Sequence, residues 1–164
     1  MGHTVPDTVP DTATDASAPE LRAAGPGDLD AVVDLLTGVF LDDPLMSAIA
    51  AAAPEPRAAL GHLHRVELAA HYLAADPAAR ADSRVDLAVD AAGGAPLGVA
   101  LWDAPSSADV VGPLGPGNEP PPGLDLDLLG GAWELCLADA AQCEAHRPAE
   151  PHWYLYMIAV APEA

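Results

Sequence analysis

The sequence predicts an α+β protein in which a mostly antiparallel, mixed sheet is flanked by helices. Apolar residues recur every three or four positions over residues 29–40, as on one face of a helix, but alternate with polar ones over residues 84–90, as in a half-buried strand. Such segments follow the order strand, helix, helix, strand, strand, helix, strand. With 164 residues, the chain can form one domain with a core but hardly two.

The first 19 residues have a composition that opposes folding. They are rich in Pro, Asp and Thr, and the quartet Val5–Thr8 repeats at once as Val9–Thr12. A segment with so little to bury does not offset the entropy lost on ordering. We therefore expect a disordered tail over residues 1–19 and a folded domain over residues 20–164.

The folded part should begin with a short strand at residues 21–24 and two helices. Pro26 occupies the first position of the first helix, with Asp28 in its first turn, and both favour a helix start. That helix should end near Asp43, because Pro44 disfavours helical geometry in the residue before it. The second helix is expected from Pro56 to Ala75.

A β-hairpin should follow the two helices. Arg84 to Asp90 alternates apolar and polar residues, Gly93 and Gly94 mark a turn, and Pro96 to Trp102 forms the second strand. The segment from Asp103 to Gly123 is rich in Pro and Gly, so we expect a mobile loop there.

A third helix and a last strand complete the predicted order. The helix should run from Leu124 to His146, weakened by the pair Gly130 and Gly131. The strand from Trp153 to Val160 is apolar on both faces, which predicts a place in the middle of a sheet covered on both sides.

The net charge of −19 excludes some classes of partner. Nucleic acids and anionic lipids are bound by neutralising phosphates with basic side chains, and the six basic residues, all Arg, cannot do this against 25 acids. Cys136 and Cys143 lie too far apart on one helix for a disulfide, so we expect small buried thiols. With no signal peptide visible, a cytoplasmic location is expected.

Several local segments resemble one enzyme family when taken in order. The segments are Leu21–Asp28, Phe40-x-x-Asp43-Pro44, Pro96–Trp102, His146, His152–Leu155 and Val160-x-Pro162. Together they resemble the GCN5-related N-acetyltransferases over about residues 20–164, and the resemblance implies an acyl-CoA N-acyltransferase fold. It also implies transfer of an acetyl group from acetyl-CoA to a small-molecule or peptide amine.

The resemblance further implies where acetyl-CoA would bind. In the family, unpaired main-chain groups of the central strand bind the pantetheine arm, and this role falls on Ile158, Ala159 and Val160. The family's Gly-rich pyrophosphate loop would follow Glu163, after which only Ala164 remains. We therefore expect the N-terminal part of an acetyltransferase domain, incomplete at its C-terminus, inactive, with weak or no binding of acetyl-CoA. The last strand could then mediate self-association.

Candidate catalytic residues are few. Tyr154 and Tyr156 alternate onto one face of the last strand and could border an acceptor pocket, although buried aromatic packing explains them equally. Glu134 and Asp139 could each act as a general base through water, but nothing distinguishes them from ordinary residues of a helix face.

Four residues of the second helix raise the question of a metal: His62, His64, Glu67 and His71. Their spacing is not that of a known zinc motif, so we expect no metal site and histidines that face solvent or a lid.

Two alternatives to an enzyme remain open. One is a non-enzymatic fragment, such as an interaction module or the product of a disrupted reading frame. The other is a small acidic binding protein whose resemblance to the family is coincidental.

Overall fold

The computed structural model describes residues 18–91, 94–105, 120–148, 150–162 and 164. The predicted disordered tail, apart from its last two residues, and most of the predicted loop over residues 103–123 lie outside the described residues.

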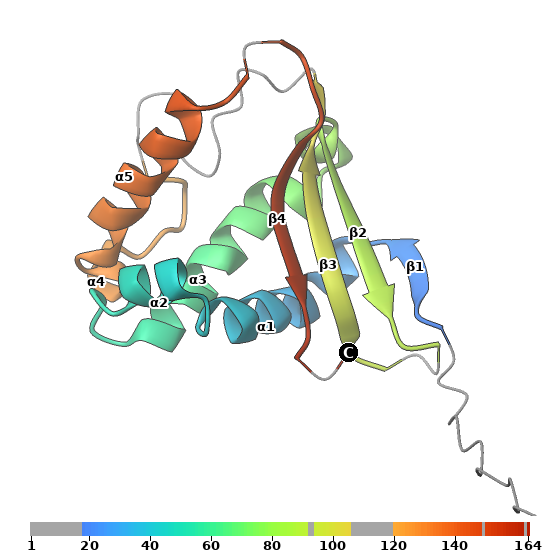
Figure 1. Ribbon diagram of the computed structural model, residues 1–164, viewed down its shortest axis with the longest axis horizontal. Helices are drawn as coiled ribbons and strands as arrows, with labels where there is room; N and C mark the ends of the chain where they lie inside the picture. The colour runs from blue at the N-terminus through green and yellow to red at the C-terminus, as the bar shows by residue number, and fades with distance from the viewer. Residues whose placement is uncertain (1–17, 92–93, 106–119, 149, 163) are drawn as a thin grey trace, which may run out of the picture.

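The described strands form one antiparallel sheet in the order β1-β2-β3-β4 (Figure 1). Its strands are β1 (Glu20–Ala23), β2 (Ser83–Val89), β3 (Pro96–Asp103) and β4 (Tyr154–Val160). The predicted hairpin is confirmed, because β2 and β3 pair over their whole length. The α+β class with an antiparallel sheet is confirmed as well.

The place of the last strand differs from the prediction. Among the described strands β4 lies at an edge of the sheet and pairs only with β3. Its side chains that point away from the helices are exposed, Ile158 by 59% and Val160 by 57%. Apolar character on both faces therefore does not mean burial of both faces here.

The helices lie on one side of the sheet (Figure 1). In chain order they are η1 (Pro26–Asp28), α1 (Leu29–Phe40), α2 (Pro44–Ala50), α3 (Pro56–Glu67), the π-helix η2 (Leu68–Tyr72), η3 (Pro77–Arg80), α4 (Leu126–Leu129) and α5 (Ala132–Ala145). None of the described helices is long and apolar enough to cross a membrane.

Helix α2 was not expected from the sequence. Asp43 precedes Pro44 and was interpreted only as the end of the first helix, yet its carboxylate caps α2. It accepts hydrogen bonds from the amides of Leu45 and Met46 at 3.0 and 2.9 Å, and Pro44 fits the first helical position. Helix α1 already ends at Phe40, so these two residues begin the next helix and do not themselves end the first.

Two hydrophobic clusters hold the layers together. The first joins the helix-facing side of β2, β3 and β4 to α1 and η2, with Leu36, Leu68 and Leu101 almost fully buried. The second lies among α2, α3, α4 and α5 and includes Ile49 and Trp133. The α5 layer is thus connected to the sheet through other helices, which leaves room between α5 and β4.

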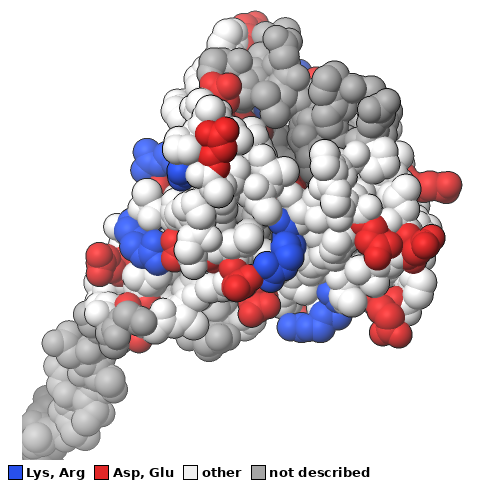
Figure 2. Space-filling model, turned by 180° about the vertical axis from the view of Figure 1, so that it is seen from behind, with Lys and Arg blue, Asp and Glu red and all other residues white. Residues whose placement is uncertain are grey.

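Four of the six arginines, Arg22, Arg65, Arg84 and Arg147, form ion pairs with acidic side chains of the described residues. Arg22 bonds both carboxylate oxygens of Asp28, and Arg65 pairs with Asp30 at 2.6 Å. On the face seen in Figure 2, the described basic side chains lie beside acidic ones and form no continuous basic surface.

The predicted weakness at Gly130 and Gly131 is a break between α4 and α5. Gly130 has φ of +51°, and a Cβ there would lie 3.1 Å from Pro54 Cδ. The Gly130→Ala variant should therefore lose about 1–3 kcal/mol of unfolding free energy.

Gly38 is the matched control, because it lies inside α1 and an added Cβ there meets nothing within 4 Å. Gly38→Ala should stabilise by about 0.5–1 kcal/mol. Urea denaturation of both variants checks the pair, and an equal effect of the two substitutions would contradict the assigned break.

Candidate functional site

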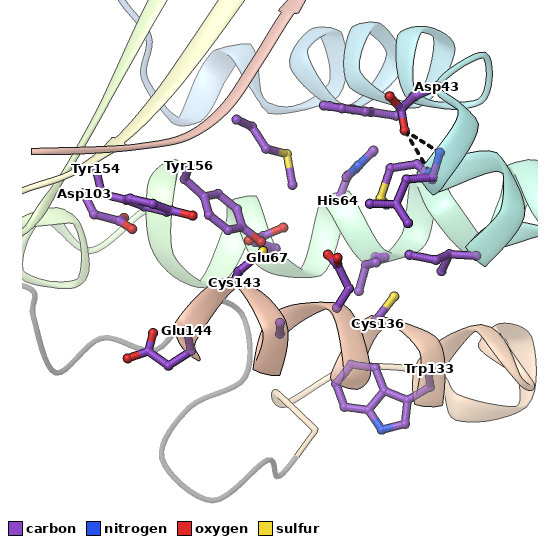
Figure 3. Close-up of a pocket in the computed structure, with 18 of the residues that line it drawn as sticks. Asp43, His64, Glu67, Asp103, Trp133, Cys136, Cys143, Glu144, Tyr154 and Tyr156 are labelled. Carbon is purple, nitrogen blue, oxygen red and sulfur yellow. Dashed lines mark hydrogen bonds between the residues drawn. The ribbon is translucent and has the colours of Figure 1, made fainter. Parts of the chain in front are cut away.

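A pocket of about 340 Å³ lies between β4 and the helices α2, α3 and α5 (Figure 3). One wall comes from the sheet, through Tyr154, Tyr156 and Met157. The other walls come from the end of α1 and from α2, α3 and α5. The pocket therefore occupies the room that the two hydrophobic clusters leave between them.

A β-bulge shapes the sheet wall. Leu155 pairs with Trp102 and Met157 with Leu101, so Tyr156 is an extra residue on β4. Such an insertion re-aims side chains. Because of it, Tyr156 and Met157 both line the pocket although they are adjacent in the sequence.

Glu67 is the buried acid of the pocket. It lies on the last turn of α3 with 5% of its surface exposed, and Figure 3 shows the Tyr156 ring directed toward it. Burial raises the pKa of Glu67 to about 7, while a hydrogen bond from Tyr156 and the nearby His71 partly oppose that rise. Its Oε1 atom has no hydrogen-bond partner among the described residues.

Asp103 forms the second buried acidic centre, at the end of β3. The Tyr72 hydroxyl donates a hydrogen bond to its Oδ1 at 2.8 Å, and Arg147 Nη2 donates to Oδ2 at 3.4 Å. His71 Nε2 lies 3.7 Å from Oδ1. Arg147 also stacks on the Tyr154 ring, 4.3 Å from its centre.

The π-helix η2 places two of these partners. Its wider turn is closed by a hydrogen bond from the Leu73 amide to the Leu68 carbonyl at 2.7 Å. A π-turn shifts the residues that follow relative to an α-helix and is frequent at functional sites. Here it directs Tyr72 to Asp103 and stacks the Tyr72 ring on Tyr156, 5.6 Å between centres.

One face of α5 lines the pocket, and it includes both cysteines, Asp139 and Glu144. Burial raises the pKa of Cys136 to about 11, and burial with Asp139 nearby also raises that of Cys143. Both thiols are thus protonated at neutral pH. The expectation of two buried thiols was wrong for Cys143, which is exposed.

The expectation of outward-facing histidines was wrong for His64. It is fully buried between α1 and α3, with Thr37 Oγ1 3.3 Å from its Nδ1. Burial lowers the pKa of His64 to about 4, so it is neutral at physiological pH. Within the described residues no group of three or more His, Cys, Asp or Glu side chains is placed to hold a metal ion.

The structure places the predicted site residues unequally. Tyr154 and Tyr156 line the pocket, whereas Glu134 is exposed on α5 and is not among the lining residues. Ile158, Ala159 and Val160 lie on β4, whose outer edge pairs with no described strand.

Sequence reasoning considered Glu67 only as part of a metal cluster that it rejected, and it missed Asp103 as a site residue. A signal existed for Glu67, which follows Leu63 and His64 on a helical stripe where a carboxylate interrupts apolar residues. Asp103 gave a weaker one, as the acid that ends an apolar strand.

Comparisons with known proteins show the fold. No known protein-family profile and no curated protein matches the chain. A solved structure described as histone acetyltransferase HPA2 and related acetyltransferase, from Corynebacterium glutamicum, matches with a TM-score of 0.56 and 24% identity. The chain shares the fold of this acetyltransferase. The match covers 89% of this chain and 62% of the length of the neighbour.

The raised pKa of Glu67 makes stability depend on pH. Between the ordinary value of 4.5 and about 7, the folded state keeps a proton that the unfolded state has lost. Stability contributed by this group therefore falls as pH rises through that window. As pH rises from 5 to 8, the unfolding free energy of the Glu67→Gln variant should increase by about 2–3 kcal/mol relative to that of the unsubstituted chain.

Chemical denaturation of both proteins at several pH values measures this difference. Burial lowers the pKa of His64, so this residue makes stability rise with pH, but it does so equally in both proteins and cancels in the comparison. Glu55→Gln, at the exposed start of α3, is the control and should show no such trend. A difference that stays constant with pH would contradict the raised pKa of Glu67.

Proposed function

We propose that the chain is an N-acetyltransferase that transfers the acetyl group of acetyl-CoA to an amine, with Glu67 as the general base. The observation that carries the proposal is the buried Glu67 carboxyl, with a pKa of about 7, in a 340 Å³ pocket beside the bulged edge strand β4. The fold shared with an acetyltransferase supports the same reaction class.

The reaction needs a base because an amine of ordinary basicity is protonated near pH 7. The Glu67 carboxylate takes a proton from the ammonium ion, and the neutral nitrogen attacks the thioester carbonyl. A C–N bond forms, the C–S bond breaks, and the second proton that the attacking nitrogen loses goes to the departing thiolate. A base with a pKa near the working pH combines a large ionised fraction with useful basicity.

Tyr156 acts in this proposal as a positioning residue. Burial and the neighbouring Glu67 raise the pKa of Tyr156 well above its ordinary value, so its hydroxyl stays protonated. A protonated hydroxyl donates to the carboxylate and holds it toward the pocket. Tyr154 lines the same wall, under Arg147.

The outer edge of β4 is the proposed place for the pantetheine arm. The main-chain groups of Ile158, Ala159 and Val160 that point away from β3 are available there, within the described sheet, for hydrogen bonds to amides. The chain spans 62% of the length of its structural neighbour, and acetyl-CoA as donor is part of the proposal.

Acetyl transfer to a model primary amine tests the role of Glu67. The same assay tests the expectation from the sequence that the chain is inactive: with transfer by the unsubstituted chain, kcat/KM should rise with pH through about 7 and then level. Glu67→Gln should lower the plateau about 100-fold or more and abolish this rise, as expected for loss of a general base.

Glu55→Gln is the control for this assay, because it makes the same substitution at an exposed site. Calorimetry with acetyl-CoA measures donor binding separately and tests the expectation that binding is weak. Full activity of Glu67→Gln with an unchanged pH profile would exclude Glu67 as the base.

A second candidate is an interaction surface on the same strand. Trp153, Leu155, Ile158 and Val160 are exposed, and the open edge of β4 can pair with a strand of another chain. Salt screens the repulsion between highly charged copies but leaves contact pairing intact.

Self-association should therefore grow as salt is added, and Ile158→Lys should reduce it. Light scattering at low and high ionic strength gives the mass. A monomer under all conditions would contradict this candidate, and the edge of β4 would then remain the proposed binding site for acetyl-CoA alone.

A further inference from the structure

We propose that the acceptor is a small primary monoamine with an apolar body, whose nitrogen lies at Glu67 and whose body extends toward α2; this rests on the proposed transfer reaction. The polar and apolar residues of the pocket are separated along its length, and this separation is the basis of the proposal.

The polar end lies against the sheet. Figure 3 shows Glu67, Asp103, Tyr154 and Tyr156 together at this end. The Asp103 carboxylate accepts a hydrogen bond from Tyr72 and forms an ion pair with Arg147. In contrast, Oε1 of Glu67 has no hydrogen-bond partner among the described residues. This end therefore presents one carboxyl oxygen to one incoming cation.

The other end is apolar. Its walls come from α2, α3 and α5 and include Met46, Ile49, Leu63 and Trp133. The polar side chains there are His64, which is buried and neutral, and Asp43, whose Oδ1 accepts the two hydrogen bonds that cap α2. A second ammonium at this end would lose its hydration against mostly apolar walls, and the one acid among the residues named there, Asp43, already accepts two hydrogen bonds as the cap of α2.

Size favours a small molecule over a peptide segment. A volume of 340 Å³ lies at the lower end of the range for small-ligand sites. Four residues of the apolar end, Met46, Ile49, Leu63 and Cys136, also line a neighbouring void of about 10 Å³. The apolar end thus borders a second, much smaller void across these four side chains.

Two acids of the α5 wall, Asp139 and Glu144, could favour a different acceptor. Glu144 pairs with Arg147 at 3.7 Å, whereas Asp139 has no hydrogen bond or ion pair within the described part of the chain. A diamine with one nitrogen at Glu67 and one at Asp139 is the competing acceptor, and the experiment must separate the two.

Binding of straight-chain amines to the chain, measured by calorimetry without acetyl-CoA, provides that separation. From propylamine to heptylamine, affinity should rise about threefold to fourfold per methylene group, the gain for burying one CH₂. 1,5-Diaminopentane and a lysine-containing peptide should bind at least tenfold more weakly than pentylamine. Equal or tighter binding of either, or affinity independent of length, would overturn the proposal.

A matched pair of variants on α5 tests the assigned direction of the apolar body. Ala140 lines the pocket next to the second hydrophobic cluster, whereas Ala138 is exposed and lies outside the lining. Ala140→Phe should weaken heptylamine at least tenfold and leave propylamine within twofold, while Ala138→Phe leaves both unchanged. If Ala140→Phe does not fold by circular dichroism, Ala140→Leu makes the same test with less added volume.

Failure of this inference can be told apart from failure of the proposed function. Acetyl transfer with no dependence on chain length would refute the monoamine class and keep the reaction. Length-dependent amine binding without transfer from acetyl-CoA would refute the reaction, and with it the role of the amine as acceptor, but would keep the assigned ligand class.

Discussion

The pocket depends on one buried carboxylate, that of Asp103, which is 1% exposed. It receives a hydrogen bond from Tyr72 of η2 and another from Arg147 beyond the end of α5. A buried charge is tolerated only when it is paired and hydrogen-bonded. Because its partners come from different elements, this single charge connects β3, the π-helix and the segment between α5 and β4.

That network also explains why Glu67 differs from Asp103. Asp103 has a guanidinium and a phenol as partners, whereas Glu67 has a phenol and an unpaired oxygen. Burial raises the pKa of Glu67, and the charge of Asp103 adds a smaller rise. The two acids therefore differ: Asp103 is paired within the structure, whereas Glu67 keeps an unpaired oxygen and a raised pKa.

The sequence predicted those features that local pattern determines. Alternation gave the hairpin, the glycine pair gave the break at Gly130, and the spacing of Tyr154 and Tyr156 placed both on the pocket side. The features that it missed depend on contacts between distant segments. Glu67 and Asp103 are separated by 36 positions, and nothing in either local sequence indicates their common pocket. The position of β4 in the sheet likewise depends on strands far away in the chain.

The bulge at Tyr156 shows how a single inserted residue changes the function of a strand. Strict alternation would place Ile158 and Val160 on the same face as Tyr156, toward the helices. Instead the bulge shifts the pattern, so that Ala159 is buried against the helices while Ile158 and Val160 point outward. The small Ala159 then fills the crowded inner position opposite Val99, and the larger side chains stay outside. One strand thus supplies a pocket wall around the bulge, through Tyr154, Tyr156 and Met157, and an open main-chain edge after it, so the proposed donor and acceptor positions lie within a few residues of each other.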